Sequence, residues 1–261
     1  MSILDLPTWL NGMVIVGGSA LLGVTLVYGL DAFVKRRRGK KDNSVFSDGL
    51  QTIGTLYAVV AGFLIFGMYT TFDVSSQQSA DEASALVLMY RSAQAFPQPQ
   101  RDQAQQAVVG YINSVITDEW PALSDRVDSP KTSKALDHLF NVYGPMEPDG
   151  RWSDQYTKSI DHLDTVAKLR FERVDQSRTS SLPTIYWFLL FAGGFITILY
   201  LSLAQVENKP VHALAVGLVA TMIGLVIFLL IEMNYPFQGD IALSPENFRN
   251  ALTYISQMGS G

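Results

Sequence analysis

Four long stretches of the chain are almost wholly apolar, and they lie in two pairs near its two ends. Each has the ~20 residues that a helix needs to cross the ~30 Å hydrocarbon layer of a bilayer. Because that layer holds no water, backbone polar groups must bond within the segment, which makes each stretch a helix. The pattern predicts an all-α membrane protein with four transmembrane helices, over 12–34, 50–72, 184–206 and 211–231.

The region 73–183, between the second and third spans, is polar, but its apolar residues recur at helical spacing. Prolines and glycines divide it into segments, and Pro121 is expected to close the second of them. Helices are therefore expected over 73–96, 101–119, 130–143 and from Ser153 toward the third span. The sequence predicts a helical domain here, with no strand-like alternation.

The tail 232–261 contains one further helix, expected over 245–258 with an acidic residue in its first turn. Its apolar residues form a stripe at helical spacing: Phe248, Leu252, Ile255 and Met258. Such a stripe favours packing on the helices of the central region. Lying along the membrane surface is the alternative.

Positive charge follows the first span and gives the orientation of the chain. The cluster consists of Lys35, Arg36, Arg37, Arg38, Lys40 and Lys41. Because short loops rich in Lys and Arg stay in the cytoplasm, the loop 35–49 is expected inside and the segment 1–11 outside. Each later span reverses the side, so 73–183 and 232–261 are expected outside. The sequence thus predicts a multi-pass protein of the inner (plasma) membrane with both termini extracytoplasmic.

Composition excludes several functional classes. The formal net charge of −5 is too small to indicate nucleic acid as a partner, and the absence of cysteine excludes disulfides and thiolate metal sites. The three histidines, His138, His162 and His212, are scattered, and no nucleophile or phosphate-binding motif occurs. We expect no catalytic residue, no metal and no cofactor, so the protein is predicted not to be an enzyme.

Small residues within the spans are spaced for close helix packing. The second span carries Gly54, Ala58 and Gly62, and similar spacing occurs in the first and fourth spans. They could pack helices within one subunit, or form a subunit interface or a narrow pore. If a pore exists, the second span is the first choice to line it, with Thr52, Thr55, Ala58 and Gly62.

Ionisable residues are almost lacking in the spans, which argues against a proton pump with a buried carboxylate relay. Asp31 is expected to pair with Lys35 one turn later, at the cytoplasmic interface. A passive pore lined by hydroxyls, apolar rings and backbone is still possible.

Three strings resemble one known family. They are Asp81-Glu82-Ala83-Ser84-Ala85-Leu86 with Tyr90-Arg91; Tyr111 followed by Asp118-Glu119-Trp120-Pro121; and Tyr235-Pro236-Phe237-Gln238-Gly239-Asp240-Ile241 with Leu243-Ser244-Pro245 and Phe248. In this order, and with two spans on either side of a helical insert, the chain resembles the bacterial bestrophin-like domain family, whose function is not established. The family name points to the bestrophins, which are pentameric anion channels.

The resemblance singles out residues that either face the outer mouth of a pore or serve the structure. They are Glu82, Arg91, Glu119, Trp120, Pro236, Phe237 and Gly239, and Glu232 at the end of the fourth span is a further candidate. Glu82 and Arg91 are too far apart to pair along one helix, so each needs a partner elsewhere, and Arg91 is expected to pair with Glu119. Trp120 is expected at a helix stop, and Gly239 in a sharp turn after the fourth span.

Two functions follow as hypotheses. The first is a homo-oligomer that conducts ions, anions if the resemblance holds, passively across the inner membrane. The excess of acidic residues in 73–183 would repel anions from a mouth that they lined. The second is a non-conducting membrane-anchored scaffold whose external helices bind an envelope partner.

Overall fold

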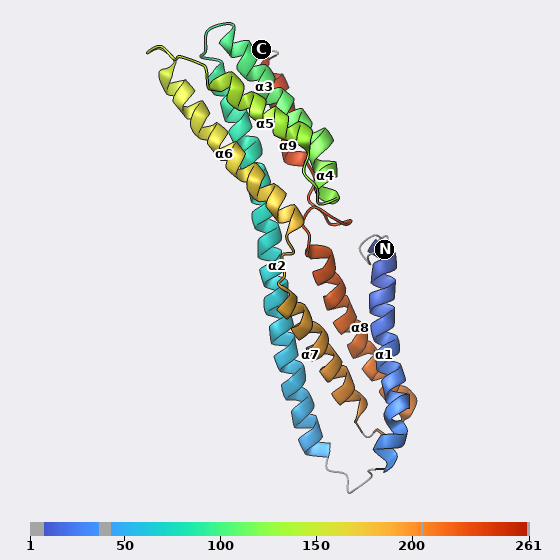
Figure 1. Cartoon of the computed structure of the whole chain (residues 1–261). Helices are drawn as coiled ribbons and strands as arrows, with labels where there is room; N and C mark the ends of the chain where they lie inside the picture. The colour runs from blue at the N-terminus through green and yellow to red at the C-terminus, as the bar shows by residue number, and fades with distance from the viewer. Residues whose placement is uncertain (1–7, 37–42, 205, 260–261) are drawn as a thin grey trace. The chain divides into compact units, whose positions relative to one another are not determined.

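The computed structural model describes residues 8–36, 43–204 and 206–259, and Figure 1 labels the helices in that part of the chain. The helices are α1 (Thr8–Arg36), α2 (Asn43–Ala93), α3 (Gln100–Ser114), α4 (Trp120–Ser124), α5 (Pro130–Tyr143), α6 (Ser153–Arg178), α7 (Thr184–Ser202), α8 (Lys209–Met233) and α9 (Glu246–Gly259), with a π-helical turn (Val115–Glu119) between α3 and α4. Within the described residues there is no strand. The predicted all-helical fold is confirmed.

Four of these helices are long and apolar enough to cross a membrane: α1, α2, α7 and α8. The chain separates into two compact units. One contains α1, the first part of α2 as far as Thr70, α7 and α8, and the other contains the rest of α2, the helices α3 to α6, and α9. α2, with 51 residues, belongs to both, because no glycine or proline interrupts it between Gly67 and Pro97.

In the first unit, α1 packs along α8 through small residues. A Cβ atom added at Gly23 would lie 2.9 Å from the Cβ of Ala220, and one at Gly224 would lie 2.8 Å from the Oγ of Ser19. Backbones this close can only pass where side chains are minimal. The small residues of the first and fourth spans therefore pack against each other within one chain.

α7 joins this unit through its own glycine pair. A Cβ added at Gly193 would lie 2.9 Å from the ring of Tyr57 of α2. One added at Gly194 would lie 2.9 Å from the Cγ2 of Ile223 of α8. The two glycines thus give α7 a smooth surface that α2 and α8 both contact. Apolar residues around Val216 and Ala220 fill the remaining space.

An ion pair between Lys209 and Asp31 joins the first turn of α8 to α1. Asn208 caps α8, accepting a 3.3 Å hydrogen bond from the amide of Val211. Asp31 therefore has a partner on another helix, where the sequence suggested Lys35. The side chain of Lys35 lies outside the described residues.

The second unit has its own apolar core, formed by α2, α3, α5, α6 and α9. Leu86, Tyr111, Leu139 and Phe248 are fully buried there, and Ile255 of α9 is 4% exposed. The apolar stripe of the tail helix thus packs on the other helices of its unit, as favoured over the membrane surface.

The helix expected to stop at Pro121 does not stop there. Proline lacks the amide proton that an α-helix needs, but the turn Val115–Glu119 is π-helical and the amide of Trp120 donates to the carbonyl of Val115. Pro121 then lies in the first turn of α4, where its missing donor costs nothing. The expected stop was wrong, and the chain runs on to Ser124.

The cap expected at the start of α5 is present. Ser129 accepts a 3.2 Å hydrogen bond from the amide of Thr132, and Pro130 follows at the first helical position.

Candidate functional site

One face of α2 in the first unit carries the residues predicted to line a pore. Thr52, Thr55, Ala58 and Gly62 are all exposed on the single chain. Among the described residues, no side chain lies within 4 Å of a Cβ placed at Gly62. This differs from Gly23 and Gly224, which are occupied by their neighbours. Gly54 and Gly62 of α2 therefore do not pack against another helix among the described residues, whereas Ala61 of the same helix is buried against α7 and α8.

The exposed face continues along the helix as one stripe. Its members recur every three or four residues: Thr52, Thr55, Val59, Gly62, Phe66 and Thr70. Tyr57 contacts α7 and lies on the opposite side of α2 from Phe66 of the stripe. The two residues are nine positions apart, which turns an α-helix through about 900°, or two and a half turns. The stripe thus points away from the rest of the first unit.

A second cluster, in the other unit, is a buried ion network of two acids and two arginines. Glu82 comes from α2, Glu119 from the end of the π-helical turn, and Arg170 and Arg173 from α6. Glu82 and Glu119 have no exposed surface, and Arg173 is 1% exposed. Charges buried this deeply are expensive unless each is paired and hydrogen-bonded.

The geometry of the network satisfies both acids. Arg173 bonds Glu82 through Nη1, and through Nη2 it donates a 2.6 Å bond to Glu119. Arg170 donates a 2.8 Å bond to the second oxygen of Glu119, and Tyr111 donates one of 2.7 Å to Glu82. Two acids and two arginines are thus matched in one network, which with Tyr111 joins four helical segments.

Aromatic rings cover the central arginine. The guanidinium carbon of Arg173 lies 5.1 Å from the ring centroid of Phe248 and 5.5 Å from that of Trp120. Trp120 donates a 2.8 Å bond from its indole to the carbonyl of Leu243, and its ring packs edge-on against Phe237 at 5.6 Å. The tail is therefore bound directly over the ion network.

Burial is the main cause of the pKa shifts of Glu82 and of its hydrogen-bond donor Tyr111. It raises the pKa of Glu82 to about 7, against the opposing charge of Arg173 and the hydrogen bond from Tyr111. Burial, reinforced by the neighbouring carboxylate, also holds the pKa of Tyr111 well above its ordinary value. Tyr111 therefore stays a donor, and Glu82 can change its charge near neutral pH.

The pairing expected between Arg91 and Glu119 was wrong. Both oxygens of Glu119 are bonded to α6, while Arg91 lies exposed on α2. The two arginines that do pair were missed as partners. Arg173 lies on the buried stripe of α6 with Leu163, Val166 and Ser177, and a charge at such a position is a sequence signal that an opposite charge faces it.

The remaining predicted residues lie apart. Glu232 is half-buried near the end of α8 in the first unit, whereas Pro236 is buried in the second. Pro236 accepts a 2.8 Å bond from the amide of Leu243, which closes the turn around Gly239. Gly239 has a φ of 80°, a backbone conformation that favours glycine.

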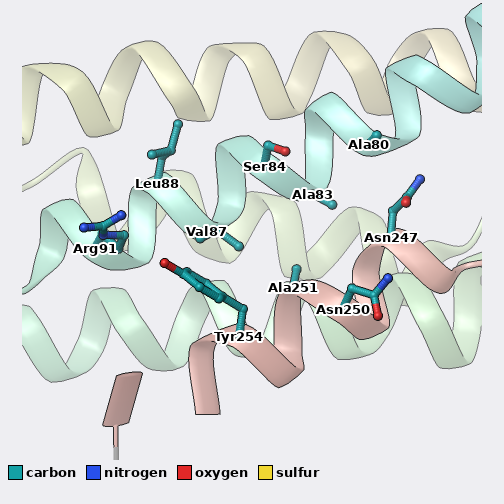
Figure 2. Close-up of a pocket in the computed structure, with 10 residues that line it drawn as sticks. All are labelled: Ala80, Ala83, Ser84, Val87, Leu88, Arg91, Asn247, Asn250, Ala251 and Tyr254. Carbon is teal, nitrogen blue, oxygen red and sulfur yellow. The ribbon is translucent and has the colours of Figure 1, made fainter. Parts of the chain in front are cut away.

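A groove of about 450 Å³ lies between α2 and α9 in the second unit. Figure 2 shows Arg91 and Tyr254 at one end and Ala80 and Asn247 at the other. Between them lie the apolar residues Ala83, Val87, Leu88 and Ala251 together with the polar residues Ser84 and Asn250. Arg91 is thus the one charged side chain among the residues that line this groove.

Comparison with known proteins gives a consistent result. A family model described as the Bestrophin-like domain matches residues 17–248. No curated protein sequence matches the chain. Among solved structures, a substituted bacterial Bestrophin homolog from Klebsiella pneumoniae is similar with a TM-score of 0.73 at 15% identity, covering 94% of this chain and 99% of that one.

Two further structures agree with this. Another substituted form of the Klebsiella pneumoniae homolog has a TM-score of 0.70 at 17% identity, covering 93% of this chain and 97% of that one. A structure described only as a membrane protein has a TM-score of 0.73 at 15% identity, covering 93% and 98%. At these identities the likeness shows a shared fold.

Proposed function

The chain belongs to the Bestrophin-like domain family, and from that premise we propose that it forms a homo-oligomer that conducts ions passively across the inner membrane, with α2 lining the pore. The observation that carries the proposal is the stripe of α2 around Gly62, which is exposed on the single chain, with no side chain of the described residues within 4 Å of a Cβ placed at Gly62. Bestrophins, to which the family name refers, are ion channels.

The chemistry of the stripe suits a narrow passive pore. Thr52 and Thr55 near one end and Thr70 near the other offer hydroxyls to a passing ion. Between them, Val59 and Phe66 would form apolar rings in an oligomer, and such a constriction can gate by losing its water. Gly62 would let the helices approach the axis closely.

We place the basic loop 35–49 in the cytoplasm and the central helices and tail outside. Lys and Arg in a short loop oppose its transfer across the membrane, whereas long segments cross largely regardless of charge. In this orientation the acid-rich second unit faces the periplasm. Its acidic excess would disfavour anions at a mouth that it lined, so both ion signs belong in the test.

The test is flux through the purified protein in liposomes, measured separately for a cation and an anion. Gly62→Phe should abolish flux, because a ring at this position of every subunit would fill the passage. Gly18→Phe is the matched control, since Gly18 of α1 is also exposed and has no side chain within 4 Å among the described residues. Loss of flux in Gly62→Phe alone, with both variants oligomeric, supports the proposal.

Equal flux in the two variants would exclude α2 as the lining helix. A monomeric wild-type protein without flux would overturn the channel altogether and favour the scaffold hypothesis.

A further inference from the structure

The second unit carries an open groove on one side of α2 and an exposed phenylalanine on the other. The groove is the one between α2 and α9 (Figure 2), and the phenylalanine is Phe171 of α6, 73% exposed. From these features we infer that the groove receives helix α6 of a neighbouring copy of the same chain. The inference rests on the proposed homo-oligomer and specifies one of its contacts.

The two features lie on opposite sides of α2. Gln78 faces α6, donating a 2.7 Å bond to Glu172 and accepting one of 2.6 Å from Gln176. Val87 lines the groove. These two residues are nine positions apart, which turns the helix by about 900° and so reverses the direction of the side chain.

This arrangement suits a ring of identical copies. A surface feature that fits a pocket elsewhere on the same molecule makes a head-to-tail contact, and such contacts close into rings when the rotation allows. With Phe171 on one side and the groove on the other, each copy would offer α6 to the next and receive α6 from the one before.

The heights of the two features also match. The bonds of Gln78 to Glu172 and Gln176 set position 78 of α2 level with about position 174 of α6. The two helices run in opposite directions, so position 81, three residues after 78 in α2, is level with Phe171, three residues before 174 in α6. Rotation about an axis along α2 keeps heights unchanged, which brings Phe171 to the end of the next copy's groove.

That end has room for an aromatic ring. It is lined by Ala80 of α2 and Asn247 of α9, and Ala83 follows one turn along α2; both alanine side chains are single methyl groups. Burying a phenylalanine there would remove apolar surface from water on both copies, which stabilises the contact.

The charges match at the other end. Arg91 is level with Asp161. Arg91 lies thirteen residues after position 78 in α2, and Asp161 lies thirteen residues before position 174 in α6. Asp164 follows one turn away, and both aspartates are exposed on α6, as is Arg91 on α2. No ion pair of Arg91 occurs within the part of the chain that the structure describes. In the ring, Arg91 gains an acidic partner, which fixes the direction and register of α6 in the groove.

Cross-linking tests the contact directly, because the natural chain has no cysteine. Ser84 lines the groove, and Lys168 is exposed on α6. The two positions are level, because Ser84 lies six residues after position 78 in α2 and Lys168 lies six residues before position 174 in α6. A chain carrying both Ser84→Cys and Lys168→Cys should give, on mild oxidation in membranes, a ladder of covalent multimers on a denaturing gel. Ser84→Cys with Asp137→Cys, an exposed position on α5, should give none.

A second measurement removes the ring. Phe171→Asp should raise the dissociation constant of the detergent-solubilised oligomer about tenfold or more, since it replaces the buried ring with a charge. Phe140→Asp on α5 is the matched control, because Phe140 is also exposed, at 41%, and lies outside the proposed contact. Light scattering after size-exclusion chromatography reads the mass.

The outcomes separate this inference from the channel proposal. An oligomer that conducts, gives no ladder and is unaffected by Phe171→Asp overturns the contact and leaves the channel standing. A ladder with dissociation in Phe171→Asp, from protein that carries no ions in liposomes, supports the contact and overturns the channel. A lipid or another protein in the groove would also prevent the ladder, and would likewise overturn the inference.

Discussion

Arg173 bonds Glu82 through one guanidinium nitrogen and Glu119 through the other, so a single side chain of α6 holds two acids from distant parts of the sequence. None of the three is exposed by more than 1%. Each charge is therefore paired in a region that excludes water, where an unpaired charge would be costly.

Arg173→Met should strongly destabilise the protein. It leaves Glu82 and Glu119 buried with one arginine between them, and breaking a buried pair in this way costs about 3–5 kcal/mol. Arg178→Met is the matched control on the same helix. Its partner is Asp128, both side chains are about half exposed, and the expected loss is about 0–1 kcal/mol. Thermal unfolding of the solubilised protein measures both, and equal melting temperatures would contradict a role of the network in stability.

Glu82 should make stability depend on pH. Its pKa is raised by burial from 4.5 to about 7, so between these values the folded state holds a proton that the unfolded state has released. The free energy of unfolding therefore increases as pH falls from about 7 to about 4.5, where this contribution is fully present. The contribution is lost as pH rises through about 7.

Glu82→Gln should remove this contribution while keeping an oxygen to accept the bond from Tyr111. The measurement is the melting temperature at pH 5 and pH 8, compared between the two proteins. Other titrating groups are common to both, so the difference between the proteins isolates Glu82. Parallel pH profiles would show that Glu82 keeps one charge state throughout this window.

The sequence predicted helices well where hydrophobic periodicity or capping residues determine them. The four spans and the cap at Ser129 follow from rules that act within one segment. The π-helical turn before Pro121 was missed, because it depends on where Glu119 must point to reach α6. Which acid pairs with Arg173 is likewise set by the packing of distant helices, and local spacing carries no information on it.

The small residues show the same limit. Gly54, Ala58 and Gly62 on α2 have the same spacing as the glycines and alanines of α8, yet one set faces outward and the other packs on α1. Spacing identifies a smooth helix face, but the neighbour on that face is decided by tertiary structure.

Gly224→Leu should disrupt the packing of α1 on α8. A Cβ at this position would already lie 2.8 Å from the Oγ of Ser19 and 3.1 Å from the Cα of Val16, so the two backbones must separate. Overpacking of this kind costs about 1–3 kcal/mol. Gly18→Leu on α1 meets no side chain within 4 Å among the described residues and should leave the melting temperature nearly unchanged. Equal effects would contradict the close approach of α1 and α8.

Sidedness is tested by single cysteines in the cysteine-free chain. Gly39→Cys marks the basic loop, and Lys158→Cys marks an exposed position on α6. A membrane-impermeant maleimide added to intact spheroplasts should label Lys158→Cys and spare Gly39→Cys, because the loop's positive charges hold it in the cytoplasm. After the membrane is permeabilised, both should label, which shows that each thiol is reactive. The reverse pattern in intact spheroplasts would place the second unit in the cytoplasm and contradict the proposed orientation.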